Sequence, residues 1–148
     1  MLAADVWLTE IHRADVVVLA GGRDPLAEAA LAGLVDGDHY FDTIAADAVF
    51  EFRYRFPGYP TEVVGREALM AVYSGYGERM TLYGANALVV NISRTPGVVI
   101  IEYEVQGDAV GSGKVYENRF ISVVAIKDRR IVGWRDYMDS LAAMSALT

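Results

Sequence analysis

The stretch from Lys114 to Leu147, KVYENRFISVVAIKDRRIVGWRDYMDSLAAMSAL, decides the fold. It contains two apolar runs, residues 115–126 and 131–138, and the polar residues 127–130 lie between them. Two apolar runs joined by a short polar segment predict a β-hairpin. The residues after Asp139 predict a short closing helix.

Asp136 is the candidate catalytic residue of this hairpin. Because side chains alternate along a strand, Asp136 shares one face with Val132, Trp134 and Met138. A carboxylate between an indole and a thioether is costly to bury unless it is hydrogen-bonded or has a raised pKa. We expect Asp136 to act as a general base in a cavity. The alternative is a buried carboxylate paired with the backbone or with an arginine.

The rest of the chain predicts helices followed by strands. Residues 1–23 are expected to form an N-terminal arm, and residues 24–148 a single domain. Asp24 and Pro25 suit the N-cap and the first position of a helix. The expected helices cover 24–35, 39–44 and 66–80, and the expected strands cover 48–56, 82–93, 98–106, 115–126 and 131–138.

Composition limits the function. The 148 residues are 53% hydrophobic, which predicts an apolar cavity, a subunit interface or both. A net charge of −7 argues against nucleic acid as a partner. No apolar run is long enough to cross a membrane. Since the chain has no cysteine and two histidines, we expect neither a metal site nor disulfides, and a cytoplasmic location.

Two glutamates on the predicted strand 98–106 allow two interpretations. Glu102 and Glu104 share one face of that strand. They face water, or they enter the cavity with Asp136 and act with it in catalysis. In the second case, repulsion among the carboxylates raises at least one pKa.

Asn118 and Tyr54 are further candidates for the catalytic site. Asn118 is a satisfied structural amide, or it donates a hydrogen bond to Asp136 or to a substrate carbonyl. Tyr54 packs in the core, or it donates in the same way. The apolar side chains expected to bind substrate are Phe50, Phe52, Tyr116, Phe120, Trp134 and Met138.

Several short motifs resemble one superfamily. Tyr116-Glu117-Asn118 and Arg135-Asp136-Tyr137-Met138 are similar to the phenazine-biosynthesis A/B proteins, and Gly133-Trp134-Arg135-Asp136-Tyr137 resembles limonene-1,2-epoxide hydrolase. From about Ala27 onward the chain resembles the SnoaL-like branch of the nuclear transport factor 2-like superfamily. The resemblance implies an α+β fold, a cone-shaped barrel in which a curved antiparallel sheet of four to six strands surrounds a pocket and N-terminal helices pack over it.

The resemblance also narrows the reaction. The epoxide hydrolase uses an Asp–Arg–Asp relay, and only its aspartate in the Trp-Arg-Asp-Tyr motif matches here, at Asp136. The relay strand reads Glu102-Tyr103-Glu104, without the arginine. Phe50 and Phe52 stand where the family has Tyr and Asn. Epoxide hydrolysis is therefore not expected. Polyketide cyclases and ketosteroid isomerases need one carboxylate beside a carbonyl and no cofactor.

Two functions follow as hypotheses. The first is a cofactor-free acid/base enzyme, of isomerase, cyclase or condensation type, acting on a small hydrophobic carbonyl-bearing metabolite. The alternative is a non-catalytic ligand-binding or dimeric scaffold module. A pocket that encloses Asp136 and Asn118 favours the enzyme, and a cone filled with aromatic side chains favours the module.

A homodimer is also expected. It would use an apolar strip on the outer face of the sheet. The strip is predicted to contain Val99, Ile101, Tyr103, Val105, Ile121, Val123 and Ala125.

Overall fold

The computed structural model describes residues 31, 33–38 and 40–148. The predicted arm at 1–23 lies outside these residues, as does most of the helix predicted over 24–35. The elements are η1 (Tyr40–Thr43), β1 (Ile44–Phe52), β2 (Glu62–Val64), α2 (Arg66–Gly77), β3 (Met80–Ile92), β4 (Val98–Ala109), β5 (Val115–Lys127), β6 (Arg130–Met138) and α3 (Ser140–Leu147). None of the helices in the described ranges is long and apolar enough to span a membrane.

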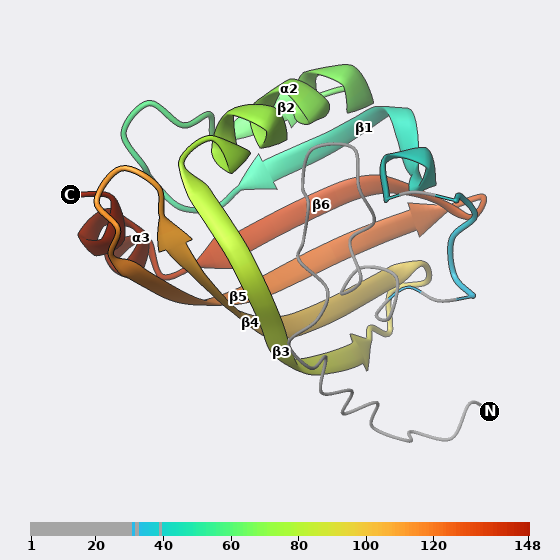
Figure 1. The fold of residues 1–148 in the computed structure, drawn as a ribbon. Coiled ribbons are helices and arrows are strands. Elements are labelled where there is room, and N and C mark those ends of the chain that lie inside the picture. Colours follow the sequence, from blue (N-terminus) through green and yellow to red (C-terminus); the bar gives the residue numbers. More distant parts are fainter. Residues whose placement is uncertain (1–30, 32, 39) are drawn as a thin grey trace.

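The six strands form one curved sheet in the order β2-β1-β6-β5-β4-β3 (Figure 1). The predicted α+β cone is confirmed. The sheet is open, however, since its edge strands β2 and β3 do not pair with each other. It is also mixed, because β1 and β6 run parallel and the other neighbours run antiparallel. Hairpin patterns predict antiparallel neighbours only, whereas β1 and β6 are joined through the whole intervening chain, a connection long enough for parallel pairing.

Curvature brings the two edges of the sheet toward one helix. The edge strands β2 and β3 both contact α2, and Figure 1 shows β3 crossing toward it. Two register shifts in the β3–β4 pairing, near Tyr83 and Ala87, insert extra residues into β3. Such bulges bend a strand and increase its twist. The C-terminal helix α3 contacts two strands of the sheet, β4 and β5.

The predicted hairpin is confirmed, with one irregularity. Asp128 and Arg129 have φ values of 50° and 60°, which a two-residue turn of type I′ requires. Ile126 pairs with Ile131, but Ala125 pairs with Gly133, so Val132 is an extra residue in β6. The alternation predicted from Val132 onward therefore begins only at Trp134.

Other boundaries differ from the predicted ones. β1 ends at Phe52, so Tyr54 and Phe56 lie in the loop after the strand. The short helix predicted over 39–44 is the 3-10 helix η1. The three-residue strand β2 is too short to leave a pattern in the sequence.

The predicted outer strip is wrong. Ile101 pairs with Ser122, and Val99 pairs with Val124, all on the inner face. Val99, Ile101 and Val105 are consequently buried. Ile121 and Val123 belong to the other face, because they pair with Glu102 and Ile100.

The outer face still carries the apolar side chains Val98, Ile100, Ile121, Val123 and Tyr137, and we propose that it forms a homodimer. Ile121 and Tyr137 are 43% and 41% exposed. Light scattering at micromolar concentration should give about twice the chain mass. Ile121→Glu should favour the monomer, because it places a charge in the interface, and Leu141→Glu on α3 should not. A monomeric wild-type chain would contradict this assembly.

The turn between β3 and β4 requires glycine at position 97. Gly97 has a φ of +75°, and a Cβ there would lie 2.4 Å from the carbonyl oxygen of Ile126. Gly97→Ala should lower the free energy of unfolding by about 2 kcal/mol or more, from left-handed backbone strain and from this clash. Urea unfolding measures the effect. Gly111→Ala is the control, since a Cβ at Gly111 meets no atom within 4 Å, and equal losses in the two variants would refute the explanation.

Candidate functional site

Asp136 lies on the inner face of β6, between β1 and β5, and is 7% exposed. Its Oδ1 accepts hydrogen bonds from Trp134 Nε1 at 2.6 Å and from Ser122 Oγ. Ser122 is fully buried and stands opposite Asp136 on β5. These two donors replace hydrogen bonds to water that the carboxylate loses on burial.

The polar contacts continue to β4. Ser122 Oγ lies 3.2 Å from the hydroxyl of Tyr103. The ring of Tyr103 is stacked on Phe120, with centroids 5.2 Å apart and planes 2° from parallel. Asp136, Ser122 and Tyr103 therefore form a hydrogen-bonded chain across three neighbouring strands.

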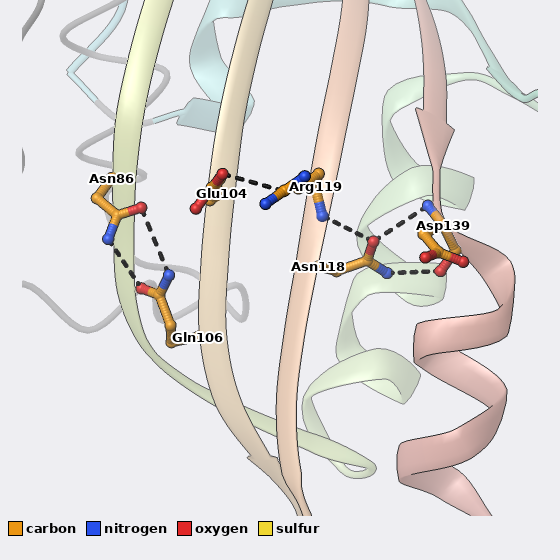
Figure 2. A network of polar contacts seen from close by, with 6 residues as sticks. All are labelled: Asn86, Glu104, Gln106, Asn118, Arg119 and Asp139. Carbon is orange, nitrogen blue, oxygen red and sulfur yellow. Dashed lines mark hydrogen bonds and ion pairs between the residues drawn. The ribbon is translucent and has the colours of Figure 1, made fainter.

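Asn118 is a structural amide (Figure 2). Its Nδ2 donates to the Tyr116 hydroxyl and to the carbonyl oxygen of Asp139, both at 2.9 Å. Its Oδ1 accepts from the backbone N–H groups of Arg119 and Asp139, at 2.8 and 3.1 Å. These contacts tie β5 to the start of α3, where Asp139 is the N-cap. These contacts agree with the structural interpretation of Asn118, and Asp136 is not among the hydrogen-bond partners of Asn118.

Glu102 and Glu104 do not join Asp136. They lie on the outer face, where Glu102 accepts a hydrogen bond from Asn91. Figure 2 shows Glu104 paired with Arg119, at a distance of 3.1 Å. The hypothesis that they enter the cavity is wrong, because the register of β4 directs Ile101 and Tyr103 inward beside Ser122 and Phe120.

Aromatic side chains fill the space next to Asp136. Phe50, Phe52 and Trp134 are at most 5% exposed. Phe50 stacks on Trp134 with centroids 5.7 Å apart, and Tyr40 meets the same indole edge-on at 6.1 Å. Of the apolar residues expected to bind substrate, these three belong to the packed core, and Phe120 is half-buried against Tyr103.

An apolar pocket of about 180 Å³ lies farther along, toward α2 and α3. Its lining residues come from the β1–β2 loop, α2 and the turn after it, β3, β5, β6 and α3. They are Tyr54, Phe56, Gly58, Tyr59, Pro60, Val72, Gly75, Arg79, Met80, Tyr116, Met138, Ala143 and Leu147. Tyr54, Tyr116 and Met138 were expected near the site, whereas neither Asp136 nor Asn118 lines the pocket.

Two of the tyrosines that line the pocket have a raised pKa. Burial raises the pKa of Tyr54 well above its usual range, with smaller contributions from Tyr59 and then from the Asp136 charge. Burial, followed by the Asp136 charge, also raises the pKa of Tyr59. Both phenols therefore remain protonated hydrogen-bond donors at physiological pH. The charge of Asp136 contributes to the raised pKa of each.

Sequence reasoning assigned no role to Ser122, Tyr59 or Arg79. Ser122 could have been found as the hydroxyl that shares a strand face with Asn118, but the Val132 bulge decides that it stands opposite Asp136. Tyr59 lies in a turn, where no periodicity indicates which way a side chain points. Within the described part of the chain, no three His, Asp or Glu side chains cluster closely enough to hold a metal ion.

The chain matches the SnoaL-like domain model over residues 27–134 and belongs to that family. It is 33% identical over 100 residues to the uncharacterised protein YesE of Bacillus subtilis, covering 68% of each chain. It is 29% identical over 112 residues to an uncharacterised PhzA/B-like protein of Pseudomonas aeruginosa, covering 76% of this chain and 79% of the relative.

A solved structure supports the same assignment. The protein described as "Putative Isomerase from Bacillus subtilis" is 28% identical, with a TM-score of 0.70 over 81% of this chain and 84% of that one. The suspected superfamily is thereby confirmed.

The hydrogen bonds at Asp136 predict different effects for two substitutions. Asp136→Asn keeps an oxygen that accepts from Trp134 and Ser122, so the free energy of unfolding should change by less than about 1 kcal/mol. Asp136→Leu removes the acceptor from two buried donors and should lower that free energy by about 2–4 kcal/mol. Urea unfolding compares them. Equal destabilisation in both variants would show that the charge itself anchors the fold.

Proposed function

We propose that this chain is a cofactor-free acid/base enzyme that moves a proton next to the carbonyl group of a small hydrophobic molecule. The observation that carries the proposal is a buried carboxylate, Asp136, whose charge acts on the protonated tyrosines of an apolar pocket. The SnoaL-like family assignment and the similarity to a protein described as an isomerase support it.

The pocket limits the size of the substrate. An apolar cavity of about 150 Å³ is large enough to bind benzene. The present pocket, at about 180 Å³, suits a molecule of about one ring with small substituents. The apolar wall favours a hydrophobic body, and the tyrosine hydroxyls favour one that carries a carbonyl oxygen.

The reaction needs only proton transfer. The Asp136 carboxylate takes a proton from the carbon next to the carbonyl, and the C–H electron pair moves into the enolate. A phenol, Tyr54 or Tyr59, donates a hydrogen bond to the enolate oxygen. In a β,γ-unsaturated ketone, return of the proton from Asp136 to the γ carbon of the dienolate completes an isomerisation. Attack of the enolate carbon on a second carbonyl carbon instead gives an alkoxide, which takes the proton back from Asp136 and completes a cyclisation or an aldol-type addition.

Asp136 does not line the pocket, so a substrate must displace a side chain to reach it. We assign this role to Met138, which follows Asp136 on the same face of β6 and lines the pocket. Methionine is unbranched and flexible, so its side chain can change rotamer at low energetic cost.

A second candidate function is non-catalytic binding of a small hydrophobic ligand. It is favoured by the absence of Asp136 from the pocket wall and by the aromatic packing of Phe50, Phe52 and Trp134 around it. In that case Asp136 serves only to fix the strands through Trp134 and Ser122.

Deuterium exchange distinguishes the two candidates without a known substrate. The chain is incubated in D₂O with phenylacetone and acetophenone, and loss of the protons next to the carbonyl is followed by NMR. Asp136→Asn should slow catalysed exchange by about 100-fold or more, because the amide cannot accept the proton. Binding of the ketones should be nearly unchanged.

Glu104→Gln is the matched control, since it removes a carboxylate from the outer face and should exchange at the wild-type rate. Exchange that survives Asp136→Asn would remove Asp136 from the reaction. Ketone binding without any exchange by the wild type would favour the non-catalytic function.

A further inference from the structure

One charged side chain, Arg79, lies among the residues that line the pocket. It follows α2 and is exposed at the rim, together with Gly58 and Gly75. Within the described residues its guanidinium forms no ion pair or side-chain hydrogen bond, so it is available to an anion. No Asp or Glu lines the pocket.

The groups around Arg79 favour an anion on the pocket side of its guanidinium. A surface groove continues outward from the pocket and shares Phe56, Arg79 and Leu147 with it. Glu78 is the carboxylate side chain that lines this groove. Because Glu78 would repel an anion placed in the groove, the position that favours an anion lies on the pocket side of Arg79.

We propose that the ligand carries a carboxylate that pairs with Arg79 at the rim while its apolar body and carbonyl group occupy the pocket. This substrate class rests on the proposed function of the same site. A planar guanidinium binds a carboxylate through two parallel hydrogen bonds. The chain has a net charge of −7, so Arg79 supplies local attraction where the overall field repels an anionic ligand.

Two matched probes test the carboxylate separately from the apolar body. 3-Phenylpropanoate and 3-phenylpropanamide have the same ring and nearly the same shape, and differ in charge. At low ionic strength the wild type should bind the carboxylate about 5- to 10-fold more tightly than the amide, as calorimetry or NMR titration measures. Added salt should reduce the difference, since the pair is exposed.

Arg79→Gln should abolish this preference and leave the affinity for the amide within about twofold. Arg94→Gln, in the exposed turn between β3 and β4, changes the net charge equally and should retain the preference. Equal binding of the two probes by the wild type, a preference that survives Arg79→Gln, or no binding of either probe would overturn the proposal.

The test of carboxylate binding does not depend on whether the chain is an enzyme. Catalysed exchange of neutral ketones by a chain without carboxylate preference would remove the role of Arg79 and leave the acid/base function standing. Carboxylate preference without any exchange would establish the subsite in a non-catalytic binding protein.

Discussion

The fold and the site both depend on one buried hydrogen-bond acceptor, the carboxylate of Asp136. A carboxylate that is 7% exposed must find hydrogen-bond donors within the protein, and Trp134 and Ser122 supply them. This requirement fixes the register of β5 against β6, since a slip of one residue would direct Asp136 to the outer face. The parallel strand β1 then covers the carboxylate with Phe52, which pairs with Asp136.

A second group of contacts couples this strand to the pocket. β6 ends at Met138, and Asp139 immediately caps α3, so the direction of the helix is set by the end of the strand. Asn118 holds that junction from β5 and at the same time bonds to the hydroxyl of Tyr116. Asn118 does not line the pocket, but its hydrogen bonds position α3 and Tyr116, which do. These contacts account for a buried polar residue in an apolar strand.

Local patterns in the sequence predicted most of the fold but less of the site. Alternation located the strands and placed Asp136 inward, because a half-buried strand leaves a period of two. It failed at Val132, where one extra residue shifts the pairing: continuing the register of Ile126 with Ile131 would place Ser122 opposite Arg135. The inner face of β4 was also misassigned, because both faces of 98–106 contain apolar residues. Pocket residues such as Tyr59 and Arg79 come from loops, whose side-chain directions depend on tertiary packing.

Charge is separated along the proposed site, and this separation would orient a ligand. Asp136 is buried, the protonated tyrosines Tyr54 and Tyr59 line the pocket, and Arg79 is exposed at the pocket rim. A carboxylate inserted deeply would approach Asp136 and lose its hydration, whereas the same group at the rim keeps water and gains a cation. A carbonyl oxygen carries no net charge until its enolate forms, so it can occupy the inner position beside the phenols. In the proposed function, the charges that select an anionic ketone also direct its carbonyl toward the base.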